Sequence, residues 1–423
     1  MPYEIALSEA RSIAVDAAGI GVAWPGDTDG SLAVVRRLGA VQIDTISVVE
    51  RAHGHVIWSR NPEYRADHVP TLEAAPRRII EYWSHAAAYL PFEHYRFCIP
   101  RMERIKAEGH EWYRTDKAVA RRVLTRVRAE GPLRVQDFEG TKKGAGGWWD
   151  WKPEKRALEY LFHAGELVST GRKGFQKVYD IPERALPGDA DLRRPTSDEH
   201  AAYYVDLAAA SLGVFAEEDV AYMRKDGLEG IGAEIAARVE DGRLVKVAIA
   251  GLAEGRGGAG NAIHLAAPGV LAHGRSRTAE EIGVHILSPF DPLLIDRKRT
   301  ARLFDRSVQL ECYLPSSKRI FGYFALPLLA WNAHGTPHIA GLLDAKAERR
   351  DRLLVARRLA FDAMPRDAAG KAPSPATIAA ALADALSDYA AFNGADRIAL
   401  ERFEAVDGRI ERSLRAALAR LSR

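Results

Sequence analysis

Gln42 and Asp44 stand two residues apart in the run Val41-Gln42-Ile43-Asp44, where apolar and polar side chains alternate. Successive side chains of a β-strand point to opposite faces, so this alternation directs the amide and the carboxylate the same way. A carboxylate can act as a general base or stabilise a developing positive charge, and an amide can position a water molecule. The two residues are therefore a candidate catalytic pair.

The same triplet has a plainer structural interpretation. A strand edge whose polar side chains face solvent and cap the following turn also explains a Gln-x-Asp sequence, which is a weak motif by itself. Taken alone, the triplet favours this structural interpretation. The sequence around it has to decide between the two.

Motifs for metal and cofactor binding are absent from the sequence. It contains no HExxH, no CxxC pair, no P-loop GxxxxGK[ST] and no GxGxxG after a predicted strand, so we expect no metal and no cofactor. No lysine adjoins the Gln42/Asp44 strand as a Schiff-base nucleophile. Glu50 is the only other carboxylate close to Asp44 in sequence, which makes a metal-dependent nuclease the weakest functional alternative.

The elements around the triplet predict a small helical unit with strands. One helix is expected over residues 8–19, capped by Ser8, and another over 31–38. The apolar run 55–58 is expected to form a further strand. This order resembles a modified winged helix, and we assign residues 1–115 to an N-terminal module that carries the triplet.

A clearer unit follows, which we assign to residues 116–195. Valines repeat every fourth residue on a helix over 117–131, which a Gly-Pro pair closes. A second helix is expected over 152–165, and the strands 167–170 and 176–179, joined by a Gly-rich basic turn, are typical of a β-hairpin. Helices followed by a basic hairpin are the order of a winged helix.

The helical pattern recurs in a third module, assigned to residues 196–275. Helices are expected over 200–212, 216–223 and 231–239, followed by a strand over 243–249. The Gly-rich tract 251–260 would form the tip of a mobile wing.

Residues 276–423 are expected to form a C-terminal β-rich module with helices. Short β-like runs occur at 282–287, 323–325 and 339–343, and Ala-rich helices are expected over 376–390 and 408–422.

Composition is typical of a folded protein of two to four modules. Of 423 residues, 47% are hydrophobic and 28% charged. The formal net charge is only +3 although 60 residues are Lys or Arg, so a polyanion would have to meet local basic clusters.

Cysteine usage and the N-terminus indicate a reducing compartment. Cys98 and Cys312 are the only cysteines and lie far apart, which argues against a disulfide framework and a thiolate zinc cage. The N-terminus lacks the pattern of a secretory leader, and no apolar run approaches the 18 residues of a membrane span. We expect a cytoplasmic protein with no membrane partner.

Two longer blocks resemble the signatures of a known family. LGAVQIDTISVVERAHGHVIWSR surrounds the triplet, and LSPFDPLLIDRKRTARLFD, followed by Tyr313-Leu314-Pro315, lies nearer the C-terminus. In order and spacing the sequence resembles the YcaQ-like (AlkX/AlkZ-type) winged-helix DNA glycosylases over nearly the whole chain. Two matching blocks favour the catalytic interpretation of Gln42 and Asp44.

The resemblance implies an α+β fold of tandem winged helices, expected to number three, with a C-terminal β-rich module and terminal helices. It also implies a monofunctional DNA glycosylase that hydrolyses the N-glycosidic bond of N7-alkylated guanine and unhooks interstrand crosslinks. The family's catalytic pair is Gln, an apolar residue, then Gln or Asp, which here is Gln42-Ile43-Asp44. With Asp at the last position of this pair, the sequence resembles the broad-substrate branch of the family. The second of two histidines often found in the family is replaced by Gly54 after His53.

Elementary chemistry agrees with this assignment. An N7-alkylated guanine is cationic and already a good leaving group, so no strong general acid is required. Cleavage makes the sugar cationic, and Asp44 suits stabilisation of that charge and activation of water, while Gln42 suits positioning of the water. A crosslinked guanine is tied to the opposite strand, so we expect an open cleft instead of a tight pocket for a flipped base.

The expected partner is double-stranded DNA that carries alkylated or crosslinked guanine. Arginines would hold phosphates, and His85 is a further candidate for the cleft. A basic stretch from Lys142 to Lys177 encloses three tryptophans, and its alternative interpretation is a solvated face with the tryptophans in the core. The expected DNA contacts are Arg51, His53, Arg60, Lys152, Lys155, Arg156, Arg172, Lys173, Arg297 and Arg299.

A non-enzymatic winged-helix regulator or architectural DNA-binding protein is the competing class. Such a protein usually needs a dimer that matches the spacing of two half-sites. Three non-identical modules in one chain and a carboxylate at Asp44, which would repel phosphate, count against it. We expect a monomer that associates with the nucleoid when it binds DNA.

Overall fold

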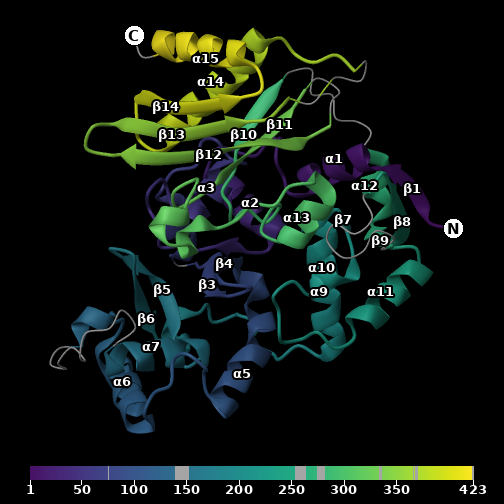
Figure 1. Cartoon of the computed structure of the whole chain (residues 1–423). Helices are drawn as coiled ribbons and strands as arrows, with labels where there is room; N and C mark the ends of the chain where they lie inside the picture. The colour runs from purple at the N-terminus through teal and green to yellow at the C-terminus, as the bar shows by residue number, and fades with distance from the viewer. Residues whose placement is uncertain are drawn as a thin grey trace.

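In the described part of the chain, the structure mixes helices with four small sheets, which confirms the expected α+β class. The five-stranded sheet and its two covering helices lie at the top of Figure 1, and the two-stranded sheet lies toward the bottom. The computed structural model describes residues 1–74, 76–138, 152–252, 263–273, 282–332, 336–364, 366 and 370–421.

The three-stranded sheet carries the Gln-x-Asp triplet at one edge. Its antiparallel strands lie in the order β2 (Val41–Gln42), β4 (Ala87–Pro91) and β3 (Ile79–Trp83). Val41 and Ile43 are buried, whereas Gln42 and Asp44 are partly exposed, as the alternation predicts. The strand ends at Gln42, earlier than expected, although the Ile43 N–H still donates to the Ala87 carbonyl at 2.8 Å.

Three helices pack near this sheet: α2 (Thr28–Leu38), α3 (Ala52–Trp58) and α4 (His68–Glu73). The Asp27 side chain caps α2 by accepting the Gly30 N–H at 3.0 Å. The strand predicted at residues 55–58 is wrong, because these residues form most of α3. His55, Val56 and Ile57 are all buried, and a short run that is apolar on every side does not distinguish a helix from a strand.

The N-terminal segment belongs to a different sheet. β1 (Tyr3–Ala6) pairs in parallel with β8 (Val245–Ala250), and β9 (His264–Ala266) and β7 (Val214–Phe215) complete the sheet. α1 (Leu7–Ala17) confirms the first predicted helix, although it begins one residue before Ser8. β1 and α1 share one apolar core with residues around β7 to β9. The start of the first predicted module therefore packs against the third predicted module.

The helices predicted for the third module are present. They are α9 (Ser197–Leu212), α10 (Glu217–Val220) and α11 (Ile231–Glu240). A further helix, α12 (Pro268–His273), was not predicted. α10 is shorter than the expected helix over 216–223, and most of the expected wing tip at 251–260 lies outside the described residues.

The region between residues 92 and 186 is a second bundle of helices with a hairpin. Its elements are η1 (Phe92–Cys98), α5 (Ile99–Glu108), α6 (Lys117–Glu130), η2 (Val135–Asp137), α7 (Pro153–His163), β5 (Val168–Lys173), β6 (Gln176–Asp180) and α8 (Pro182–Ala185). The two predicted helices and the hairpin are confirmed, and the turn lies at Gly174-Phe175. Lys142, Lys143 and the tryptophans at 148, 149 and 151 lie outside the described residues.

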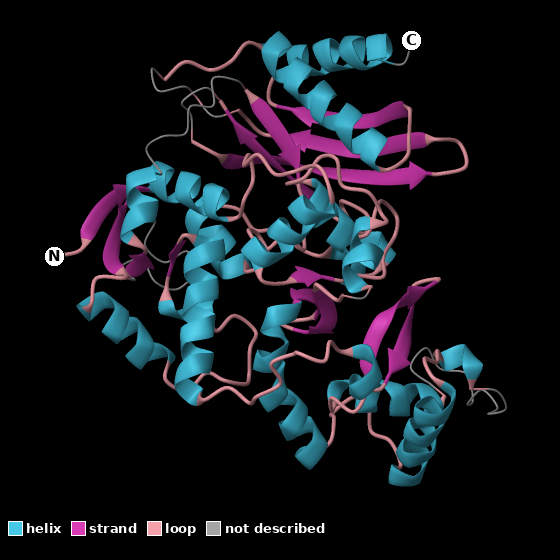
Figure 2. Ribbon diagram, turned by 180° about the vertical axis from the view of Figure 1, so that it is seen from behind, coloured by secondary structure: helices cyan, strands magenta, loops and turns pink. Residues whose placement is uncertain are grey.

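The C-terminal sheet has two helices on one face (Figure 2). α14 connects β13 to the parallel β14, and α15 packs beside α14. The two Ala-rich helices are confirmed, whereas the strand expected at 323–325 begins only at Leu326 and both β13 and β14 were missed. The elements are β10 (Gly283–Ile286), α13 (Arg297–Phe304), η3 (Glu311–Tyr313), η4 (Ser316–Lys318), β11 (Leu326–Trp331), β12 (His338–Glu348), β13 (Leu353–Phe361), α14 (Pro375–Phe392), β14 (Arg397–Ala405) and α15 (Gly408–Leu421).

A buried ion pair joins the N-terminal helices to the loop after β10. Arg60 donates to both carboxylate oxygens of Asp291 at 2.8 and 2.9 Å, and both side chains are fully buried. Arg60 also donates to the Ala18 carbonyl at 2.6 Å. The expected contact of Arg60 with DNA is therefore wrong, because its guanidinium is buried and binds only groups inside the protein.

Arg299 is a second basic residue that the structure removes from the expected set. Its side chain is buried in α13 and donates to the carbonyls of Leu212 and Val214 at 2.8 and 3.2 Å. Arg299 therefore ties α13 to the end of α9 and does not reach DNA.

No described helix is long and apolar enough to cross a membrane. The division of the chain at residues 115, 195 and 275 stays a prediction.

Replacing Arg60 by alanine is expected to destabilise the fold strongly. The change leaves the Asp291 carboxylate buried without its partner, which should lower the free energy of unfolding by about 3–5 kcal/mol. Urea denaturation followed by circular dichroism measures the loss. Arg65→Ala is the control, because Arg65 pairs with Asp67 on the surface, with 69% of its side chain exposed. Equal midpoints for the two variants would contradict the structural role of Arg60.

Candidate active site

Gln42 is held by a histidine from the neighbouring hairpin. Gln42 pairs with Ala88 across β2 and β4, and the turn that joins β3 to β4 carries His85. The His85 Nε2 atom lies 3.0 Å from the Gln42 Oε1 atom. The amide therefore projects from the strand toward an imidazole that the same sheet positions.

The Gln42 oxygen that faces His85 fixes the direction of this hydrogen bond. Burial, with a smaller contribution from the Arg224 charge, lowers the pKa of His85 to about 4, so the ring is neutral near pH 7. An amide oxygen can only accept, so the single ring proton lies on Nε2 and is donated to Gln42 Oε1. The Gln42 amide nitrogen then keeps its two hydrogens for another partner.

Asp44 follows directly after the strand and is partly withdrawn from water. Its Oδ1 atom accepts the Ile46 N–H at 2.7 Å, which fixes the carboxyl in the turn. Burial raises the pKa of Asp44, while the Ile46 hydrogen bond and the Arg51 charge oppose that rise. Asp44 lies in no ion pair within salt-bridge distance among the described residues. Its charge is therefore available to a substrate.

Residues of the C-terminal module lie near enough to Asp44 to feel its charge. The Asp44 charge adds to burial in raising the pKa of both Cys312 and Tyr313, so η3 lies close to the carboxylate. Tyr313 is 80% exposed, and the Arg297 charge acts on its hydroxyl. The sequence block that contains Tyr313 carried the family resemblance, but its position beside Asp44 could not be read from it.

The tip of the β5–β6 hairpin docks against α3. The Arg51 guanidinium lies 3.9 Å from the centre of the Phe175 ring, and the His53 ring stacks on the same side chain at 6.1 Å between centroids. These three residues line a groove of about 1200 Å³. Burial lowers the pKa of His53 to about 3, so this imidazole is neutral and contributes no positive charge to DNA binding.

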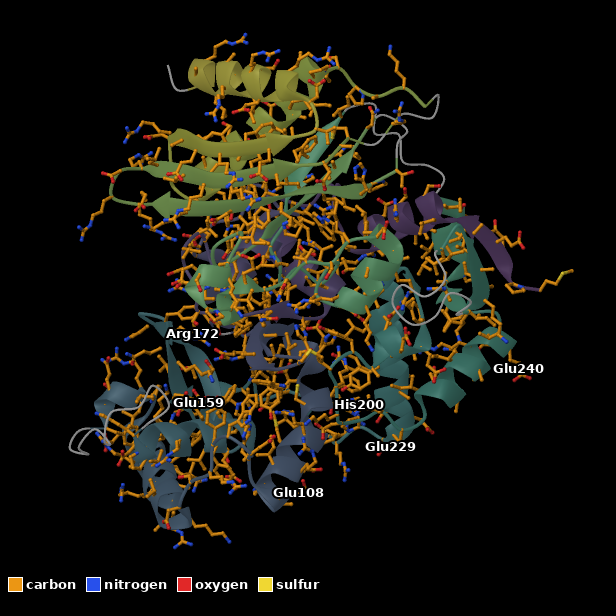
Figure 3. The ribbon with its side chains drawn as sticks, viewed as in Figure 1. Glu108, Glu159, Arg172, His200, Glu229 and Glu240 are labelled. Carbon is orange, nitrogen blue, oxygen red and sulfur yellow. The ribbon has the colours of Figure 1, made fainter. Side chains whose placement is uncertain are left out.

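Arg172 reaches the same place from β5, at the end of the hairpin that faces the N-terminal helices (Figure 3). It donates to both oxygens of the buried Glu81 at 2.7 and 3.0 Å. Its guanidinium carbon also lies 4.5 Å from the centre of the Phe175 ring. Only 14% of the Arg172 side chain is exposed. The pair holds the hairpin to β3, so Arg172 is mainly part of the scaffold.

The remaining expected DNA contacts are scattered. Lys173 at the hairpin and Arg297 at the start of α13 are exposed, and Arg297 lies on the side of Tyr313. Lys152, Lys155 and Arg156 are partly buried at the start of α7, in the other bundle. The structure thus brings Gln42, Asp44, His85, Arg51 and Arg297 toward one region and leaves the α7 residues elsewhere.

A search of the described residues found no group of three or more His, Cys, Asp or Glu side chains placed to hold a metal ion. Glu50, the nearest carboxylate in sequence, pairs with Arg349 at 3.3 Å.

The small sheets and the helical bundles define a mixed α+β protein, in which a carboxylate stands near an oriented amide. The family model for AlkZ-like DNA glycosylases matches residues 35–392. The chain belongs to this family and is a DNA glycosylase. Among solved structures it is similar to the Streptomyces sahachiroi DNA glycosylase AlkZ, with a TM-score of 0.58 and 14% sequence identity over 95% of this chain and 100% of the other. That likeness supports the fold.

Removal of the Arg51 charge is expected to raise the pKa of Asp44 further. Arg51 opposes the effect of burial, so the carboxyl in Arg51→Ala should hold its proton to a higher pH. Carbon-13 NMR of the aspartate carboxyls, assigned with Asp44→Asn, follows this titration. Arg51→Lys keeps a charge and should titrate nearly as the wild type does. A pKa that is the same in all three proteins would show that Arg51 does not act on Asp44.

Proposed function

We propose that the protein hydrolyses the N-glycosidic bond of N7-alkylated guanine in double-stranded DNA and unhooks interstrand crosslinks, with Asp44 and Gln42 at the reacting sugar. The observation that carries the proposal is the half-buried Asp44 carboxylate, which has no ionic partner among the described residues and stands next to a hydrogen-bonded Gln42. Family membership favours an enzyme over the alternative of a non-enzymatic regulator.

The chemistry needs one anion and one placed water. As the cationic base departs with its bonding electrons, the sugar becomes an oxocarbenium ion, and the Asp44 carboxylate stabilises it by electrostatic attraction. Partial burial strengthens that attraction because fewer water molecules screen it. Asp44 then accepts a proton from the water that attacks the anomeric carbon. A neutral guanine leaves far less readily, so selectivity for damage follows from the substrate.

His85 acts as a positioning residue in this scheme. While the ring proton stays on Nε2 and is donated to Gln42 Oε1, the amide cannot turn over without losing this hydrogen bond, and its NH2 group stays directed toward the water. A water that accepts from Gln42 and donates to Asp44 has its remaining lone pair free for the sugar. Positioning of the water in this way increases the rate of hydrolysis without any additional charged group.

We further propose that the enzyme is monofunctional, because no lysine adjoins the candidate pair in sequence. Exposed Arg297 and Lys173 are the strongest remaining candidates for phosphate contacts. The partner in the proposal is duplex DNA bound by a monomer. A cytoplasmic location remains a proposal that rests on the two cysteines, which are free thiols.

Asp44→Asn is expected to abolish release of N7-methylguanine from duplex DNA. The neutral amide keeps the shape but removes the charge that stabilises the sugar cation, so the single-turnover rate should fall by about 10²–10³ or more. Liquid chromatography of the released base measures the rate.

Affinity for the same duplex, measured by fluorescence anisotropy, and the thermal midpoint serve as controls that the variant still folds and binds. Base release at the wild-type rate from Asp44→Asn would remove this mechanism.

A double-mutant cycle tests the positioning role of His85. His85→Ala should lower kcat about tenfold or more in the wild-type background, but should add little once Gln42→Ala has removed the amide that His85 orients. His85→Asn, which can still donate from an amide, should recover part of the rate. His68→Ala is the matched control, because His68 is also buried and contacts Ser31 at 2.8 Å. Additive effects of His85→Ala and Gln42→Ala would contradict the proposed coupling.

A further inference from the structure

A cavity of about 270 Å³ is lined by His85, the residue that contacts Gln42, but not by Gln42 itself. The turn of the β3–β4 hairpin forms one wall, α5 forms another, and α9 with the loop before α11 closes the third. Figure 3 marks His200 on α9 and Glu108 at the end of α5, the two helices that flank the cavity. His85 lines the cavity while it holds the candidate catalytic amide, so the cavity and the site share a side chain.

Aromatic rings make up much of the lining. Trp83 and Trp112 meet edge to face with 6.3 Å between centroids, and Tyr204 also lines the cavity. Guanidinium groups already sit over two of these rings: Arg101 lies 5.3 Å from Trp83, and Arg224 lies 4.4 Å from Tyr204. Flat aromatic faces with flat cations beside them are the environment that stacks another planar ring.

Two further features indicate a ligand. The Arg101 Nε atom is buried with no hydrogen-bond partner among the described residues, and an unpaired buried donor is costly until an acceptor meets it. Trp112 and Met223 line the cavity with 65% of each residue exposed, which is unusual for large apolar side chains. Met223 also holds a positive φ of 51°, a conformation that a residue with a Cβ rarely adopts.

Charge indicates which ring system would enter. Four cationic side chains and two carboxylates line the cavity, and Asp226 already pairs with Arg104 at 2.5 Å and with Arg101 at 3.6 Å. The remaining excess of positive charge disfavours a cationic N7-alkylguanine. A neutral planar ring is favoured instead, and an acceptor atom at its edge would also meet the Arg101 Nε–H.

We propose that this cavity is a second substrate subsite, which takes a neutral planar aromatic group while the damaged guanine stands at Gln42 and Asp44. The group can come from either of two sources: an aromatic arm attached to the alkylated guanine, or a nucleobase displaced from the duplex beside the lesion. The inference rests on the proposed function. It implies that lesions with aromatic arms are preferred substrates, or that the duplex is opened at the lesion.

Trp112→Ala tests the subsite, because Trp112 is exposed and its loss should not unfold the chain. Single-turnover base release is measured on duplexes with N7-methylguanine or N7-(naphthylmethyl)guanine, each with 2-aminopurine as the base next to the lesion to serve as a fluorescent reporter. If the arm occupies the cavity, the rate on the naphthylmethyl adduct relative to the methyl adduct falls about tenfold or more, and Trp112→Phe restores it. If a nucleobase occupies it, both rates fall together, and the quenching of 2-aminopurine by the wild type is lost in Trp112→Ala.

Tyr3→Ala is the matched control, since Tyr3 is an aromatic residue 43% exposed on β1 and does not line the cavity. An unchanged rate ratio together with identical 2-aminopurine fluorescence in wild type and Trp112→Ala overturns the subsite, and so does a common fall in rate without a fluorescence difference. Absence of base release by the wild type contradicts the proposed function. The fluorescence comparison needs no base release, so it decides on its own whether a nucleobase enters the cavity. For the arm, the corresponding test without base release is a binding competition, in which the methyl duplex displaces a bound naphthylmethyl duplex.

Discussion

The partial withdrawal of one carboxylate from water is the constraint on which the candidate site depends. Asp44 loses part of its hydration at the end of β2, and the structure compensates with one backbone N–H and the more distant charge of Arg51. A closer cation would bind the carboxylate and cancel its effect on a substrate. Full burial would keep it protonated. The observed balance leaves the carboxylate partly buried, without a cation in salt-bridge distance among the described residues.

Several unrelated contacts keep that balance in place. The Arg60–Asp291 pair fixes α3 against the loop after β10, and the chain from there leads to η3, which stands beside Asp44. The Arg172–Glu81 pair holds the hairpin tip, where Phe175 supports the Arg51 guanidinium. Two arginines thus serve the site from inside the fold, by positioning elements that come from distant parts of the sequence.

The sequence predicted the local features well. Periodic valines and a closing Gly-Pro located α6, and the Gly-rich turn located the β5–β6 hairpin, because these signals act over a few residues. Val41 and Ile43 predicted the orientation of Gln42 and Asp44 for the same reason. The helix at His55 was missed because an apolar run without polar gaps has no readable period, and tertiary burial decided its form.

Long-range relations could not be predicted. Nothing in the sequence of β1 shows that it pairs with β8 more than 200 residues later, or that Tyr313 stands beside Asp44. The sequence also did not show which arginines are buried: Arg60 and Arg299 are, whereas Arg297 is exposed. Each of these depends on which partner a side chain meets in three dimensions, and charge-rich sequences offer many partners.

The dependence of base release on pH tests the central claim most directly. The carboxylate must be ionised to stabilise the sugar, so activity should be lost as the pH falls through the pKa of Asp44, and burial places that pKa above the ordinary value of 3.8. Single-turnover release of N7-methylguanine should therefore show an acid limb above 3.8. A rate that stays constant while NMR shows Asp44 taking up its proton would contradict the account.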